Sequence, residues 1–222
     1  MKHYYLIVDT ETTKKQTVAD FGAVITDRKG NIVDQFGAMV LGHFGKFDLF
    51  ADDTAPASAF WSEQSAQRRA KNYDQMLENG ERSISSVGLI NQWLSATNAR
   101  YNPVLTAYNI SFDFGKCRNT RINLGIFNQK FCLMKAAKRA IGSLADYHDF
   151  CYTNNLLTAI RKTPSMTADT MAKYILGIDL QDEPHTALED ARDYEAVILA
   201  YILNGKTRKQ LLELGRLSLI HI

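Results

Sequence analysis

The chain has 222 residues, of which 45% are hydrophobic and 23% are charged. This length and composition exclude a mini-protein, a disordered chain and a fibrous protein, and they fit one domain with a sizeable core. The formal net charge is +2. Dedicated nucleic-acid binders are often much more basic, so the charge by itself favours a small-molecule enzyme. The first residues match neither a secretory signal nor a membrane span, and we therefore expect a cytoplasmic protein.

Apolar runs in the chain predict a sheet. The first run stops at Asp9, and the next two flank a tight turn at Gly30-Asn31, so the first three strands are expected to form an antiparallel meander. The later strands alternate with helices, which favours parallel pairing. The five expected strands are 4–8, 18–27, 31–41, 103–107 and 127–134.

Helical spacing dominates the rest of the chain. The expected helices are 58–79, 83–96, 111–123, 144–153, 167–176, 186–203 and 207–214. A loop or small hairpin is expected between 154 and 165, where Asn-Asn and Thr-Pro occur. The pattern predicts one α/β domain over residues 1–205, with a mixed five-stranded sheet flanked by helices. Residues 206–222 are rich in leucine and are expected to pack on the same domain as a tail, with docking of a partner chain as the alternative.

The chain has three cysteines, Cys117, Cys132 and Cys151, and this odd number favours a reducing compartment over a disulfide framework. His148 and Cys151 have a ligand-like spacing, so a zinc site that includes all three cysteines is one interpretation. Buried core thiols are the favoured alternative.

The first motif that carries chemistry is Asp9-Thr10-Glu11-Thr12. Residues two apart in a strand point to the same face, so both carboxylates can converge at the strand end, where Mg²⁺ or Mn²⁺ binds to oxygen ligands. The alternative is a solvated strand end, because such a short motif often occurs by chance.

The second motif places Asn109 before a predicted helix and Asp113 one turn into it. An ordinary helix start also accounts for these residues, with Asn109 or Ser111 as the N-cap and Asp113 near the positive end of the helix dipole.

The third motif runs from His185 to Asp190. Thr186 and Glu189 have the spacing of a capping box, so the helix is expected to begin there and to leave His185 on the preceding loop. From that loop, His185 and Asp190 can face one cleft. A surface histidine is the alternative, and Asp193 is interpreted as a helix-surface acid.

Together, the three motifs resemble the DEDDh 3′–5′ exonucleases, a superfamily that includes polymerase-proofreading exonucleases, RNase T and oligoribonuclease. The resemblance covers residues 4–203 and implies an RNase H-like fold with two divalent ions, Mg²⁺ or Mn²⁺. It implies that Asp9 bridges the ions, that Glu11 and Asp190 hold the water-activating ion, and that Asp113 supports the other through solvent. His185 would accept the proton of the attacking water.

The same resemblance implies a single-stranded 3′ end as substrate and nucleoside 5′-monophosphates as products. The residues expected to contact substrate are Thr10, Thr12, Asn109, Phe112 and Lys116. Two positions depart from the family pattern. Lys14 stands where proofreading members often have glycine, and Tyr108 stands where many members have histidine, so substrate preference stays open.

A basic run between residues 114 and 145 could steer phosphates, with a solvated basic helix face as the alternative. Its cations are Lys116, Arg118, Arg121, Lys130, Lys135, Lys138 and Arg139. Arg68, Arg69 and Lys71 form a weaker second candidate. Phe60 and Trp61 are expected to be core residues, and stacking on terminal bases is the alternative.

These features leave several functions open. A free-standing exonuclease acting on DNA is favoured over an RNA-trimming enzyme and over a proofreading subunit, which would need a separate polymerase chain as partner. A homodimer is also compatible with the sequence. A catalytically silent nucleic-acid-binding module belongs to a different class, and it has no physical need for clustered carboxylates that repel phosphate.

Overall fold

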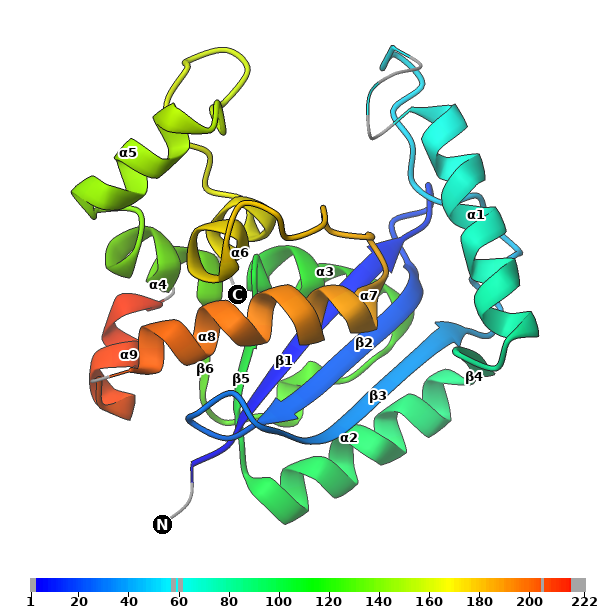
Figure 1. Ribbon diagram of the computed structural model, residues 1–222. Coiled ribbons are helices and arrows are strands. Elements are labelled where there is room, and N and C mark those ends of the chain that lie inside the picture. The colour runs from blue at the N-terminus through cyan, green and yellow to red at the C-terminus, as the bar shows by residue number, and fades with distance from the viewer. Residues whose placement is uncertain (1–2, 57–58, 60–61, 205, 217–222) are drawn as a thin grey trace.

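The computed structural model describes residues 3–56, 59, 62–204 and 206–216 (Figure 1). Phe60, Trp61 and the end of the predicted tail, 217–222, lie outside these ranges, so the roles considered for them stay predictions. Within the described ranges, no helix is long and apolar enough to cross a membrane.

A mixed sheet lies at the centre of the structure, and its six strands within the described ranges follow the order β4-β3-β2-β1-β5-β6 (Figure 1). β1, β2 and β3 pair antiparallel, whereas β5 pairs parallel with β1, β6 with β5, and β4 with β3. The α/β class, the meander and the parallel later strands are confirmed, but the predicted count of five strands is wrong. The strands are β1 Tyr5–Thr12, β2 Val18–Thr26, β3 Ile32–Val40, β4 Ser83–Ser85, β5 Val104–Ala107 and β6 Lys130–Cys132.

The additional strand, β4, takes the residues that were predicted to begin a helix at Ser83. It pairs with the end of β3, and the helix begins only after Ser86, whose hydroxyl accepts a hydrogen bond from the backbone N–H of Leu89 at 3.2 Å. A strand of three residues is too short to show an alternating pattern, which is why the sequence did not reveal it.

The strand predicted over 127–134 is shorter than expected. Only β6 is extended, and the chain turns directly into helix α4, which was not predicted. Leu133, Ala136 and Ala137 are buried on one side of α4. Their spacing is helical, but basic residues lie between and beside them. The apolar run that precedes them also resembles a longer strand, so the sequence did not indicate this helix.

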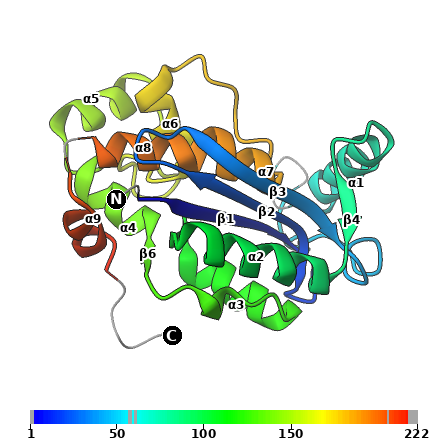
Figure 2. The ribbon, with the colours of Figure 1, turned by 90° about the horizontal axis from the view of Figure 1, so that it is seen from below.

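Helices cover both faces of the sheet, with α2 and α3 on one side and α8 on the other (Figure 2). The helices are α1 Glu63–Glu78, α2 Val87–Tyr101, α3 Ile110–Thr120, α4 Leu133–Ala140, α5 Ala145–Thr153, α6 Ala168–Leu176, α7 Ala187–Glu189, α8 Ala196–Leu203 and α9 Arg208–Leu214. A 3₁₀ turn, η1 (Leu124–Ile126), follows α3, and a π-helical segment, η2 (Asp190–Glu195), joins α7 to α8.

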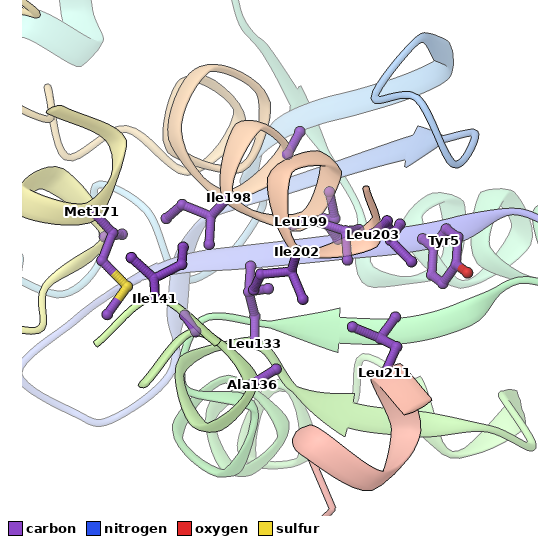
Figure 3. Close-up of a cluster of buried hydrophobic side chains, with 14 of the residues drawn as sticks. Tyr5, Leu133, Ala136, Ile141, Met171, Ile198, Leu199, Ile202, Leu203 and Leu211 are labelled. Carbon is purple, nitrogen blue, oxygen red and sulfur yellow. The ribbon is translucent and has the colours of Figure 1, made fainter. Parts of the chain in front are cut away.

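Strand β1 contributes to two separate cores because successive side chains of a strand point to opposite faces. Tyr5 and Ile7 pack with α4, α8 and Leu211 of α9 in the cluster shown in Figure 3. Leu6 and Val8 pack against α2 and α3 on the other face. This alternation determines which side of the sheet the acids further along β1 face.

The cysteines do not form one metal site. Cys117 and Cys132 belong to the core beneath α2 and α3, whereas Cys151 belongs to the core on the α8 face. Nε2 of His148 lies 2.8 Å from the carbonyl oxygen of Gly142. All three thiols are free and buried, so the structure favours core thiols over a zinc site.

Candidate active site

Strand β1 continues past its predicted end and carries the first motif within it. Its pairing with β2 places Asp9 beside Gly22 and Glu11 beside Asp20. By alternation, Asp9 and Glu11 share the face of Ile7, which is covered by α8, while Thr10 faces α3. The predicted same-face placement of the two acids is therefore confirmed, but they lie in the strand and not after it.

Asp113 lies in the first turn of α3 and is 3% exposed. The hydroxyl of Thr10 donates a hydrogen bond of 2.8 Å to Oδ1 of Asp113, which fixes the carboxylate beside β1. Asn109 is the N-cap residue, but its side chain makes no capping hydrogen bond. The polar residues of this motif therefore do more than begin a helix.

His185 lies on the loop before α7, as predicted, in the left-handed backbone region with φ of 55°. A non-glycine residue rarely adopts this conformation. The predicted capping box is not formed, because the Thr186 side chain accepts no capping hydrogen bond. Glu189 instead accepts hydrogen bonds from the guanidinium of Arg82.

Buried polar contacts hold α7 against the sheet. Oδ2 of Asp20 accepts a hydrogen bond of 3.0 Å from the backbone N–H of Ala187, and Oδ1 lies 3.4 Å from Nε of Arg82. The side chains of Asp20 and Arg82 are 0% exposed. Asp20 lies on β2 directly beside Glu11 of β1, and Arg82 also contacts Glu189 of the third motif. The ion pair between Asp20 and Arg82 therefore connects the third motif to the first.

Gly22 permits an unusually close approach at the same place. A Cβ atom on Gly22 would lie 2.2 Å from the backbone carbon of Ala187, which no real packing allows. Figure 1 shows α7 beside β2. Gly22 pairs with Asp9 across the strands. Because Gly22 has no side chain, α7 can lie close to β2, and Asp190, three residues after Ala187, lies near the acids of β1.

A cavity of about 400 Å³ lies where these elements meet. All ten residues predicted from the sequence line it, and they come from β1, the start of α3 and the segment before and within η2. They are Asp9, Thr10, Glu11, Thr12, Asn109, Phe112, Asp113, Lys116, His185 and Asp190. Single oxygen or nitrogen atoms of Glu11, His185 and Asp190 lie within 4.8 Å of one another, a spacing that could hold a metal ion.

Two carboxylates of this cavity and one arginine beside it were not predicted from the sequence. Glu183 and Glu195 add two carboxylates to the lining. Arg69, considered only as part of a surface basic group, is 7% exposed, and its Nη1 lies 3.4 Å from Oε2 of Glu11. Its Nη2 donates to the carbonyl oxygen of Phe50 at 2.8 Å. The burial of one arginine in a polar helix gave no signal in the sequence.

Burial makes ionisation of these acids unfavourable. Burial first, and then neighbouring carboxylates, raise the pKa of Asp190 to about 9 and that of Asp9 well above its usual range. Burial raises the pKa of Glu11 to about 8 although Arg69 opposes it, and it raises the pKa of Asp113 to about 7. Burial and then the charge of Arg69 lower the pKa of His185 to about 4. The charges of Arg69 and Lys116 thus do not offset the effect of burial on Glu11 and Asp113.

These shifts predict how stability depends on pH when no metal is bound. The pKa values of Glu11 and Asp190 are raised to about 8 and 9 in the folded state, so the unfolded chain releases these protons first and stability is lost as the pH rises. The lowered pKa of His185 acts in the opposite direction, but only below about pH 6.5.

We therefore expect the melting temperature in EDTA to fall between about pH 6.5 and pH 9. Mg²⁺ or Mn²⁺ is expected to raise it more at pH 9 than at pH 6.5, because the ionised carboxylates bind cations. Differential scanning calorimetry at both pH values measures this. A melting temperature in EDTA that rises over this range would contradict the raised pKa values of these buried acids.

The predicted basic run does not form one face. Lys116 lines the cavity, and its Nζ donates a hydrogen bond to Oε1 of Gln16. The same atom lies 4.5 Å from the ring centre of Phe112. Arg139 instead donates to the carbonyl oxygen of Glu213 at 3.1 Å and so holds α9. Only part of the run is therefore placed to meet a phosphate in the cavity.

The two departures from the family pattern have structural partners. Nζ of Lys14 pairs with Asp53 at 3.0 Å and with Glu63. The hydroxyl of Tyr108 donates to the carbonyl oxygen of Met166. Both side chains are thus engaged in contacts within the chain.

Comparison with known proteins shows what the fold is. No family model matches the chain, and no curated protein matches it. The structure of E. coli exonuclease I with a 5cy-dT13 oligonucleotide aligns over 96% of this chain and 42% of its own, with 15% identity and a TM-score of 0.53. The chain shares the fold of exonuclease I.

Other solved structures resemble it as well. The zinc-bound form of the E. coli exonuclease I complex with single-stranded DNA aligns over 96% of this chain and 42% of its own, with 15% identity and a TM-score of 0.52. Exonuclease X with 5′ overhanging duplex DNA aligns over 95% and 99%, with 21% identity and a TM-score of 0.44. The chain spans less than half the length of these exonuclease I chains. The exonuclease I fold confirms the predicted RNase H-like class.

Proposed function

We propose that this protein is a metal-dependent 3′–5′ exonuclease of the DEDDh kind, which hydrolyses nucleic acid, with DNA favoured, to nucleoside 5′-monophosphates. One observation carries the proposal: carboxylates from three distant segments and a loop histidine line a single cavity in an exonuclease I fold. Two solved structures with this fold are complexes of exonuclease I with a DNA oligonucleotide or single-stranded DNA, one of them zinc-bound.

The cavity has the donors that divalent ions prefer. Its carboxylate oxygens are hard ligands suited to Mg²⁺ or Mn²⁺. Oδ1 of Asp190 is buried and has no hydrogen-bond partner among the described residues. Asp9, Glu11, Asp113 and Asp190 would hold two ions, which lower the pKa of a bound water and neutralise charge on the phosphoryl oxygens.

We assign to His185 the role of accepting the proton of the attacking water. Its lowered pKa keeps the imidazole neutral at pH 7, and only the neutral ring can accept a proton. It lies within reach of Glu11 and Asp190 and is only half-buried. The contact from Thr10 holds Asp113 in place, and Arg69 adds positive charge beside Glu11.

The mouth of the cavity suits a single-stranded end. Phe112 lines the cavity and is 44% exposed. Its ring can stack on a base, a contact that contributes about 1–3 kcal/mol to binding. Lys116, above the Phe112 ring, is placed for a phosphate. Thr12 and Asn109 add polar groups beside it.

The proposal predicts metal-dependent shortening of nucleic acid. We expect 5′-labelled single-stranded DNA to shorten one nucleotide at a time with Mg²⁺ or Mn²⁺ and to stay intact with EDTA. Single-stranded DNA, duplex DNA and RNA oligonucleotides are compared in parallel, and chromatography identifies the mononucleotide released. An Asp113→Asn variant purified in the same way controls for contaminating nucleases.

The outcomes separate the alternatives. Faster shortening of RNA would favour the RNA-trimming enzyme, and activity only with an added polymerase would favour the proofreading subunit. Binding without shortening of any substrate would favour a silent module and contradict the proposal. The mass of the protein in solution, measured by light scattering, tests the expected possibility of a homodimer.

A further inference from the structure

Glu195 is a carboxylate of the cavity that neither the motifs nor the proposed roles account for. It is 2% exposed and lines the cavity together with the predicted ligands. Its Oε2 has no hydrogen-bond partner among the described residues. Leaving a buried carboxylate unpaired costs several kcal/mol, so such a group stays protonated or lies near a cation.

The π-helical segment explains why Glu195 faces the cavity. Five residues separate it from Asp190, and in an α-helix five steps would turn the two side chains about 140° apart. Both residues lie in η2, which spans Asp190–Glu195. In a π-helix, hydrogen bonds join residues five apart, so these two positions lie much nearer to one face than they would in an α-helix. The backbone N–H of Ala196 closes such a bond with Ala191.

The surroundings of Glu195 are other acids. Burial is the main cause of the raised pKa values of Asp9 and Glu195. Among the neighbouring charges, Glu195 has the largest effect on the pKa of Asp9, and Asp113 has the largest effect on that of Glu195. Tyr108, which stands between β5 and α3, lines the cavity together with Glu195 and Asp113. Glu195 therefore lies close to Asp9 and Asp113, and the charge of Asp190 also acts on it.

We propose that Glu195 is a fifth carboxylate ligand of the divalent-ion site, on the side of Asp9 and Asp113. The inference rests on the proposed function, since it assigns this residue to the same pair of ions. It accounts for three features together: the burial of the side chain, its unpaired oxygen, and a π-helical segment in place of a continuous α-helix. Short π-helical segments are frequent at functional sites.

Calorimetric titration with Mn²⁺ tests the assignment without measuring activity. We expect Glu195→Gln, which removes the charge and keeps the shape, to weaken Mn²⁺ binding about tenfold or more at one of the two sites. Asp193→Asn is the matched control, because Asp193 belongs to the same segment but pairs with Arg192 outside the cavity. This variant is expected to bind Mn²⁺ as the wild type does.

Thermal melts give a second readout. Without metal at pH 8, Glu195→Gln is expected to melt at a higher temperature than the wild type, and added Mn²⁺ is expected to raise its melting temperature less. Glu195→Ala serves as a second variant if glutamine does not pack, with the same weakening of Mn²⁺ binding expected.

Two failures can be told apart. A wild type that binds no Mn²⁺ would overturn the proposed function and this inference with it. A wild type that binds Mn²⁺, with unchanged affinity in both Glu195 variants, would overturn the inference alone and identify Glu195 as a protonated structural group.

Discussion

Replacement of His185 by Asn is expected to slow nucleotide release by about 10²- to 10⁴-fold, the usual contribution of a general base. The reason is that an amide cannot take a proton from water, whereas the neutral imidazole of His185 can at pH 7. Binding of Mn²⁺ and of a single-stranded oligonucleotide is expected to stay within a few-fold of wild type. Single-turnover rates and calorimetric titration measure the two quantities separately.

Asparagine is chosen because of the backbone at this position. His185 has φ of 55°, a region that asparagine adopts more readily than alanine or most other residues. A loss of rate can then be assigned to the ring and not to a displaced loop. Near-full turnover would exclude His185 as the base. A parallel loss of Mn²⁺ binding would instead make His185 a metal ligand, which its position near Glu11 and Asp190 also permits.

Replacement of Arg82 by Met is expected to destabilise the protein by about 3–5 kcal/mol, because it leaves the buried carboxylate of Asp20 without its cation. Arg82 contacts both Asp20 and Glu189, and Asp20 in turn holds the first backbone N–H of α7. The loss is therefore expected to loosen α7 as well. Urea unfolding at pH 7, followed by circular dichroism, measures the change in the free energy of unfolding.

Two further variants make this result specific. Arg192→Met removes an arginine from the exposed pair with Asp193 and is expected to cost less than about 1 kcal/mol. Adding Asp20→Asn to Arg82→Met removes the buried negative charge that Arg82→Met leaves without a cation. The double variant is therefore expected to recover part of the free energy of unfolding. A loss for Arg82→Met no larger than that for Arg192→Met would show that the buried pair does not hold α7 in place.

Much of the site could be predicted because it depends on local periodicity. Alternation along β1 places Asp9 and Glu11 together whatever the rest of the chain does. The loop position of His185 follows from the helix start after it, although the interaction that was expected to cap that helix does not form. These predictions needed only neighbours in sequence.

The missed features depend on contacts between distant segments. No neighbour in sequence indicates that Arg69 of α1 and Arg82, just before β4, lie against Glu11 and Asp20. Glu195 is placed outside the cavity by any α-helical projection, and only the π-helical turn reverses this. Likewise, β4 forms because its backbone pairs with the edge of β3, and not because its three residues favour a strand.

The hydrogen bond between Thr10 and Asp113 has a consequence for how the domain unfolds. Asp9 and Glu11 approach the cavity from the face covered by α8, whereas Asp113 approaches from the face covered by α3. Unfolding of the core on either face of the sheet would therefore separate Asp113 from Asp9 and Glu11. A divalent ion held between them would therefore bind only the intact domain, and by mass action it would stabilise both layers as one cooperative unit.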